Sequence, residues 1–285
     1  MGLSALSEAE RHAFCAPRAP VAGLTWDAPR VMGILNATPD SFSDGGRDAA
    51  AVIRAGAAMA ADILDVGGES TRPGAAEVDA DAEIARVVPV IRGLAKRRVS
   101  IDTRKAAVAE AALAAGAGIV NDVSALGFDP ALAGVVARTG APVVLMHSRG
   151  TPETMGGETG YDDVVVEVIA ALEARVAEAV AAGIARERIV VDPGIGFAKT
   201  AAQNLALIRA LTAFHGLGLP VLLGASRKRF IGAIAGDPEG AADRRDAGSL
   251  AVTLAGVAAG VQLHRVHDVA GTVQGLQLWE AARDR

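Results

Sequence analysis

Short apolar runs alternate with longer segments of helical spacing along most of this chain. Mainly apolar runs, which predict buried strands, occupy positions 31–35, 62–66, 99–101, 119–123, 142–146, 189–191, 219–225 and 261–266. An alanine-rich segment predicted as a helix follows each run, at positions 48–60, 79–96, 105–115, 130–139, 162–182, 201–214, 243–259 and 269–282. Eight strands, each followed by a helix, predict a closed parallel barrel of the α/β class, the (β/α)8 or TIM barrel.

The helical spacing is clearest over positions 162–182. Apolar residues recur there three or four positions apart and form one face of a helix: Val165, Val168, Leu172, Val176 and Val180. Glycines predict the C-terminal ends of four of the helices: Gly116, Gly140, Gly183 and Gly216.

An open, doubly wound sheet is the alternative arrangement of such alternating elements. The even eightfold repeat and the absence of a G-x-G-x-x-G turn favour the closed barrel. No linker rich in Pro, Gly or Ser divides the chain, so we predict a single barrel domain at positions 30–285. Positions 1–29 are predicted as an N-terminal extension, with a brief strand or hairpin near positions 21–30.

Composition excludes several classes of protein. The chain has 285 residues, 51% of them hydrophobic, which predicts a folded core. A net charge of −5 without a basic stripe argues against a nucleic-acid partner. Cys15 is the only cysteine, so neither a disulfide framework nor a cysteine metal cluster is expected. Since no apolar run reaches signal-peptide or membrane-spanning length, we expect no membrane association and a cytoplasmic location.

Polar groups follow every predicted strand, where a TIM barrel places its catalytic residues. The groups considered are Asn36, Glu69, Ser70, Thr71, Arg72, Asp102, Thr103, Asn121, Asp122, Met146, His147, Asp192, Phe197, Ser226, Arg227, Lys228, Arg265 and His267. Taken singly, an Asp or Asn after a strand is often a helix N-cap, and a lone histidine is more often structural. Convergence on one rim instead predicts a site for a charged, hydrogen-bonding small molecule.

Three of these residues indicate which hydrogen-bonding groups the bound small molecule carries. Asp102, Asn121 and Asp192 come from the third, fourth and sixth strands and should lie deep in one mouth. Two carboxylates with an amide suit a flat heterocycle with several N–H donors, because such bonds are charge-assisted. A Ser-His-Asp nucleophile is disfavoured, since no G-x-S-x-G motif is present.

A second group suits an anion. Arg72, Arg265 and His267 together with Asn36 could hold a diphosphate or triphosphate, with a divalent ion bound loosely by oxygen ligands. Arg265 and His267 lie two apart on one strand, so both should face the rim. Lys228 can reach between the anion region and the heterocycle region.

Eight motifs in order along the chain resemble dihydropteroate synthases. They are NATPDSFSDGG (36–46), DVGGESTRPG (65–74), SIDTRK (100–105), NDVS (121–124), MHSRG (146–150), DPGIGF (192–197), SRKRFIG (226–232) and RVHDV (265–269). The first two are specific by themselves, whereas SIDTRK is not. The resemblance runs from about position 30 to the C-terminus and leaves out positions 1–29.

The resemblance implies a transferase of folate biosynthesis, a family known as a sulfonamide target. It would join (7,8-dihydropterin-6-yl)methyl diphosphate to 4-aminobenzoate and release diphosphate, with Mg²⁺ as cofactor and a homodimer as assembly. The implied catalytic residues are Asp102, Lys228, Arg265 and His267. The implied substrate-binding residues are Thr71, Arg72, Asp102, Asn121, Met146, Asp192, Phe197, Ser226, Lys228, Arg265 and His267, and the implied metal ligand is Asn36.

Two other classes stay open at this point. A pterin-binding methyltransferase domain has a similar barrel and pterin pocket, but it needs no diphosphate pocket, and Asn36, Arg265 and His267 argue against it. A catalytically silent paralogue would bind a ligand without turnover. A decayed copy is expected to lose rim residues, and here none is missing.

Overall fold

Eight parallel strands form one sheet in the computed structural model, which describes residues 13–37, 49–70 and 74–283. The strands are β1 (Arg30–Asn36), β2 (Ile63–Gly67), β3 (Val99–Asp102), β4 (Ile119–Asp122), β5 (Val143–Met146), β6 (Ile189–Asp192), β7 (Leu222–Leu223) and β8 (Leu263–Val266). Their order is β6-β5-β4-β3-β2-β1-β8-β7. A parallel bridge between Val191 and Val221 joins the two outermost strands. The sheet therefore curves into the predicted barrel.

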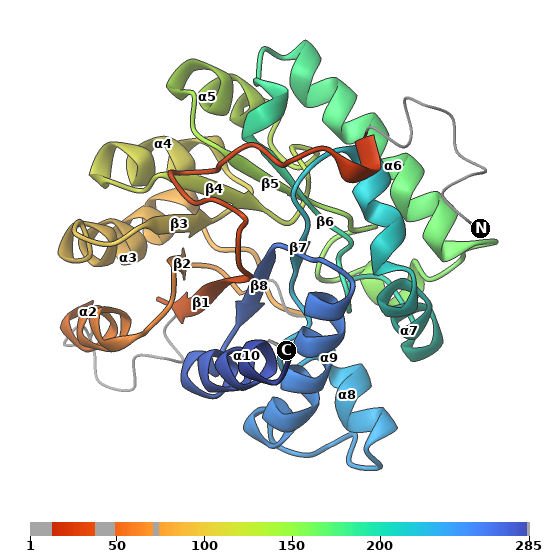
Figure 1. Cartoon of the computed structure of the whole chain (residues 1–285). Helices are drawn as coiled ribbons and strands as arrows, with labels where there is room; N and C mark the ends of the chain where they lie inside the picture. Colours follow the sequence, from red (N-terminus) through yellow and green to blue (C-terminus); the bar gives the residue numbers. More distant parts are fainter. Residues whose placement is uncertain (1–12, 38–48, 71–73, 284–285) are drawn as a thin grey trace.

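Helices surround this sheet (Figure 1). They are α2 (Ala49–Ala58), α3 (Ala80–Gly93), α4 (Ala106–Ala115), α5 (Ala131–Thr139), α6 (Val164–Ala181), α7 (Ala201–Arg209), α8 (Arg229–Ile234), α9 (Asp246–Ala258) and α10 (Val269–Arg283). Gly116 and Gly140 end α4 and α5 in the left-handed conformation, as predicted. Within the described ranges, no helix is long and apolar enough to cross a membrane.

The inside of the barrel changes character along its axis. The layer nearer the N-terminal ends of the strands is an apolar cluster of inward-facing residues: Met32, Ile63, Ile119, Val144, Val190, Leu222 and Leu263. Val21 and Leu24 belong to the same cluster. Since alternate residues of a strand face the same side, the inward positions two or four residues later are Asn36, Asp65, Asn121, Met146, Asp192, Arg265 and His267. The polar side chains thus gather at the C-terminal ends of the strands.

Near the brief strand or hairpin predicted at 21–30, Val21 and Leu24 form a single antiparallel bridge that closes a two-residue turn. Two other local predictions were wrong in detail. The helix predicted at 201–214 ends at Arg209, and a 3-10 helix, Leu211–Leu217, follows. Gly216 lies inside that 3-10 helix, which ends instead at Gly218 with a φ of 71°. The short helix α8 lies between the strand predicted at 219–225 and the helix predicted at 243–259, and it was not predicted.

Candidate active site

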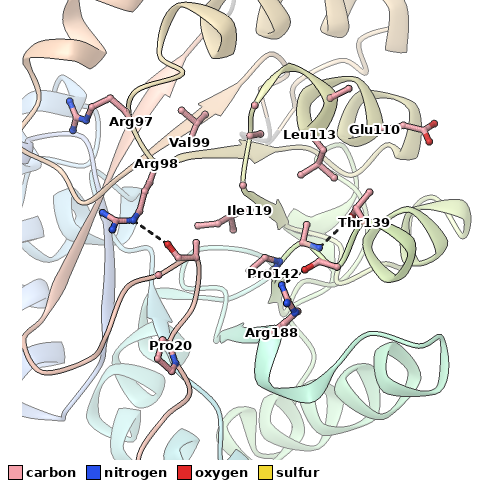
Figure 2. Close-up of a pocket in the computed structure, with 18 of the residues that line it drawn as sticks. Pro20, Arg97, Arg98, Val99, Glu110, Leu113, Ile119, Thr139, Pro142 and Arg188 are labelled. Carbon is pink, nitrogen blue, oxygen red and sulfur yellow. Dashed lines mark hydrogen bonds between the residues drawn. The ribbon is translucent and has the colours of Figure 1, made fainter.

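A cavity of about 940 Å³ opens at the N-terminal ends of the strands (Figure 2). Arg98, Ile119, Pro142 and Arg188 are among its lining residues, and none of the predicted site residues is. The predicted residues lie at the opposite, C-terminal ends of the same strands. The chemistry of the side chains therefore places the candidate site there, away from this cavity.

An arginine and two carboxylates from three strands meet inside the mouth of the barrel. The Nε atom of Arg265 lies 2.6 Å from Oδ2 of Asp65, and its Nη2 atom lies 2.6 Å from Oδ2 of Asp102. Asn121 donates from Nδ2 to the same Asp65 oxygen at 2.9 Å. The Oδ1 atoms of both aspartates are buried and have no hydrogen-bond partner in the described part of the chain. Each can accept a hydrogen bond from a ligand.

Asp65 was not predicted as a site residue. It is fully buried and interrupts the apolar strand β2 at an inward position. A carboxylate inside an apolar strand is itself a signal, because a buried charge needs a partner. In this molecule that partner is Arg265.

Burial changes the ionisation of the two predicted pterin-pocket aspartates. The pKa of Asp102 is raised to about 7, mainly because burial disfavours the charged carboxylate; Arg265 opposes this rise and nearby Asp65 adds to it. Burial likewise raises the pKa of Asp192 to about 6, opposed by the backbone N–H of Gly194 and by Lys228. Both carboxyls therefore titrate close to neutral pH.

The turn after β6 places an aromatic ring beside a cation. Asp192 accepts a hydrogen bond from the N–H of Gly194 at 2.7 Å. Gly194 has a φ of 69°, and a Cβ there would lie 1.8 Å from the carbonyl oxygen of His147, so only glycine fits. The turn ends at Phe197, whose ring centroid lies 3.9 Å from Nζ of Lys228. The predicted residues Asp192, Phe197 and Lys228 therefore lie together.

Ser226 and His267 bind each other across the ends of β7 and β8. The Ser226 hydroxyl accepts from the backbone N–H of His267 at 3.1 Å and lies 3.0 Å from its Nδ1 atom. The hydroxyl can donate to Nδ1 or accept from it, because it has a second lone pair, so the direction of this bond follows the tautomer of His267. In either case the contact fixes the orientation of the ring.

Other residues at the strand ends serve the scaffold. Asp122 accepts from the backbone N–H groups of Ser124 and Leu126 and so caps the turn after β4, rather than a helix. Lys105 pairs with Glu69 and, at 2.8 Å, with Glu83. The Glu69 carboxylate also accepts from the backbone N–H of Val78. This buried network therefore connects the two ends of the segment that links β2 to α3.

Thr71 and Arg72 lie outside the described residues, whereas Met146 is buried and inward-facing at the end of β5.

Asn36 ends β1 at an inward position and is exposed. Among the described residues, no group of three or more His, Cys, Asp or Glu could hold a metal ion. A magnesium ion bound mainly by substrate phosphates and water needs few protein ligands, so the Asn36 amide oxygen fits this kind of site.

Comparison with known proteins points to one family. The family model described as "Pterin binding enzyme" matches residues 32–267. The dihydropteroate synthase of Escherichia coli K12 is 43% identical over 267 residues, which cover 89% of this chain and 91% of that protein.

Two solved structures of the Xanthomonas albilineans dihydropteroate synthase are also similar. The structure with 4-aminobenzoic acid has a TM-score of 0.86 and 46% identity, covering 94% of this chain and 99% of that one. The complex with 7,8-dihydropteroate has a TM-score of 0.84 and 44% identity, covering 94% and 100%. The fold, the polar mouth and these matches agree, and the chain belongs to the pterin-binding enzyme family, among its dihydropteroate synthases.

Proposed function

We propose that this protein is a transferase that condenses (7,8-dihydropterin-6-yl)methyl diphosphate with 4-aminobenzoate, giving 7,8-dihydropteroate and diphosphate. The observation that carries the proposal is the pair of buried, unpartnered Oδ1 atoms of Asp65 and Asp102 beside Asn121. A pterin ring offers the N–H donors that such acceptors need. The Xanthomonas albilineans complexes with 4-aminobenzoic acid and 7,8-dihydropteroate support the same substrates.

The pterin ring would lie in the mouth of the barrel. Asp102 and Asp192 accept its N–H groups, and Asn121 is oriented for it by its bond to Asp65. Met146 supplies an apolar surface, and Lys228 lies at the border between the pterin and the second substrate.

The chemical step we propose begins with departure of the diphosphate. The bond between the pterin methylene carbon and the diphosphate oxygen breaks, and the electron pair leaves with the oxygen. The developing positive charge on the pterin is stabilised by the ionised Asp102, a preorganised electrostatic effect. The neutral aromatic amine of 4-aminobenzoate then attacks the methylene carbon and afterwards loses one proton to solvent, so no strong base is needed.

The diphosphate would be bound at the same rim. We assign Arg265 and His267 to its oxygens, with Lys228 supplying a further positive charge as it leaves. Asn36 would hold the Mg²⁺ that accompanies the diphosphate. When bound, this ion supplies charge neutralisation to the leaving group. Thr71 and Arg72 belong to the proposal as substrate-binding residues, at positions outside the described ones.

The second substrate would stand beside the ring of Phe197 and the hydroxyl of Ser226. These residues flank Lys228 in space, since Phe197 contacts its ammonium and Ser226 precedes it on the same strand end. The flat ring of 4-aminobenzoate can pack on Phe197 with its amine directed toward the pterin methylene carbon.

The proposal includes a homodimer and a cytoplasmic location. Sedimentation velocity of the purified chain checks the assembly, and a single boundary at the monomer mass would contradict it.

Release of diphosphate, measured with both substrates and Mg²⁺, tests the function. Product should form only when both substrates are present, and its mass should be that of 7,8-dihydropteroate. A pterin-binding methyltransferase domain would release no diphosphate. A catalytically silent paralogue would bind the pterin in a calorimeter and yet make no product, and either result would overturn the proposal.

A further inference from the structure

Lys199 is a buried lysine that the proposed reaction does not use, and burial lowers the pKa of its ammonium group to about 7. Its side chain is 9% exposed, and its Nζ atom contacts three acceptors. They are Nδ1 of His147 at 3.0 Å, the carbonyl oxygen of Gly194 at 3.0 Å and the carbonyl oxygen of Phe197 at 2.9 Å. An ammonium group has three N–H donors, so these contacts use all of them.

The three acceptors come from two different loops. His147 follows β5, whereas Gly194 and Phe197 belong to the turn after β6. The pKa of His147 is lowered to about 3, mainly by burial and in part by the charges of Lys199 and Arg149. The imidazole is therefore neutral at pH 7, which leaves Nδ1 able to accept from Lys199.

The turn after β6 needs such support because its glycines allow many backbone conformations and Ala198 is strained. Gly194 and Gly196 have φ values of 69° and 82°, and Ala198, which carries a Cβ, has a φ of 49°. Backbone conformations of this kind persist only where the surroundings hold them. A second support comes from α7, where Asn204 accepts from the N–H of Gly196 at 2.6 Å.

The end of this turn faces the site. Phe197 is the residue whose carbonyl oxygen Lys199 binds and whose ring contacts Lys228. A Cβ at Gly196 would lie 2.8 Å from Cδ of Lys228, so the turn and the Lys228 side chain are closely packed. A small displacement of the turn would therefore move the ring of Phe197 relative to Lys228.

We infer that Lys199 is a positioning residue, which ties the β5 and β6 loops together and so fixes the Phe197 ring where the second, aromatic substrate packs. This inference rests on the proposed function for the identity of that substrate. Lys199 touches neither substrate in this arrangement and acts through Phe197. On the pterin side, Asp65, Asp102 and Asn121 are held by contacts that do not involve Lys199, whereas Asp192 shares Gly194 with it.

The test compares Lys199→Met with the parent protein. Methionine keeps the length and bulk of the side chain and removes the three donors. The KM for 4-aminobenzoate should rise by about tenfold or more, the scale of a lost charge-assisted contact. The affinity for a pterin without diphosphate, measured by calorimetry, should fall by a smaller factor than the KM rises, because only Asp192 among the proposed pterin residues shares the turn. Lys96→Met, at an exposed lysine beyond the end of α3, is the matched control and should leave both values at the parent level.

A double variant separates positioning from general damage. Because Lys199 acts through Phe197, Lys199→Met combined with Phe197→Ala should bind 4-aminobenzoate no worse than Phe197→Ala alone. Lys199→Ala should regain a low KM when ethylammonium is added, whereas tetramethylammonium, which has no N–H donor, should not restore it. If Lys199→Met does not fold, Lys199→Gln, which keeps two donors, is measured instead and should give an intermediate KM.

An unchanged KM for 4-aminobenzoate in an active Lys199→Met enzyme would overturn the inference, as would fully additive effects in the double variant. Amide hydrogen exchange of residues 194–197 tests the structural part without any substrate. Exchange should quicken in Lys199→Met and stay at the parent rate in Lys96→Met, and equal rates in all three proteins would also overturn it. A parent that makes no product, with quickened exchange in Lys199→Met, would instead refute the proposed function alone.

Discussion

Arg265 on β8 forms a salt bridge with Asp102 on β3, with Nη2 and Oδ2 separated by 2.6 Å. The two residues are 163 positions apart in the chain, and the same guanidinium also pairs with Asp65. Arg265 is thus the counterion of the carboxylates that we assign to the pterin, besides its proposed role toward the diphosphate. Substitution of Arg265 should therefore affect the binding of both the pterin ring and the diphosphate.

Arg265→Ala should abolish product formation and weaken binding of a pterin without diphosphate by about tenfold or more. Removing one partner of a buried ion pair leaves the charge of the other partner uncompensated. Here the carboxylates of both Asp65 and Asp102 would lose their counterion. Arg265→Lys, which keeps a positive charge but not the two-pronged geometry, should lose less. Calorimetry with the bare pterin decides the matter, and an affinity equal to the parent's would show that Arg265 serves the diphosphate only.

Asp192→Asn should weaken pterin binding by about 1.5–3 kcal/mol, which is roughly a 10- to 150-fold loss of affinity. The amide oxygen can still accept from Gly194, so the turn stays in place, but the second oxygen becomes an N–H donor that faces the donors of the pterin. Glu110→Gln, at an exposed carboxylate on α4, is the control and should bind as the parent does. Unaltered affinity in Asp192→Asn would remove Asp192 from the pterin site.

Pterin affinity should rise as the pH increases from about 5.5 to 8. The pKa values of Asp192 and Asp102 are raised by burial to about 6 and about 7, so protonated carboxyls become acceptors over this range. Above about pH 8 both are ionised and the affinity should level off. In Asp192→Asn the step near pH 6 should be missing. A flat calorimetric profile in the parent protein would contradict the role of these carboxyls.

Asn36→Ala should raise the Mg²⁺ concentration needed for half-maximal activity while leaving the affinity for the bare pterin unchanged. The amide oxygen of Asn36 is the one ligand that we propose the protein gives to the ion. Asn36→Asp, which offers a carboxylate oxygen instead, should keep a low Mg²⁺ requirement. The proposal fails if the Mg²⁺ titrations of Asn36→Ala and parent superimpose.

The free energy of unfolding should fall as the pH decreases from about 6.5 to 4, partly because of His264. This imidazole is fully buried, neither of its nitrogens has a partner among the described residues, and burial lowers its pKa to about 4. The unfolded chain, with a pKa near 6.5, binds a proton over this range and the folded protein does not. The contribution of neutral His264 to the free energy of unfolding is therefore fully present above about pH 6.5. It is lost progressively at lower pH, by about 3 kcal/mol in total.

His264→Leu should flatten this dependence, since leucine has no proton to bind. Urea denaturation of parent and variant at several pH values measures the difference. His147, whose pKa is also lowered, titrates in both proteins, so the difference between their curves isolates His264. Parallel curves across the whole range would show that His264 does not contribute.

The sequence alone determined the strands, most of the helices and the end of the barrel that carries the site. These features depend on local periodicity: an apolar run such as 189–191 marks a buried strand wherever it lies, and Asp192 at its end must emerge at the mouth. Local rules were weaker at 201–214, where Gly216 predicted the end of a helix that had already stopped at Arg209. The alternation of residues also put Arg265 and His267 on one side of β8.

Only the tertiary structure decided which polar groups meet. Asp102 and Asp122 both end a strand in the sequence, yet the first pairs with Arg265 inside the barrel and the second caps the backbone that follows it. Closure of the sheet brings β8 within reach of β2 and β3, and the register of the barrel sets Asp65 level with the guanidinium of Arg265. The link from Lys199 to both loops arises in the same way. Such pairings depend on strand stagger and on contacts between distant segments, and no local pattern of hydrophobic and polar residues encodes them.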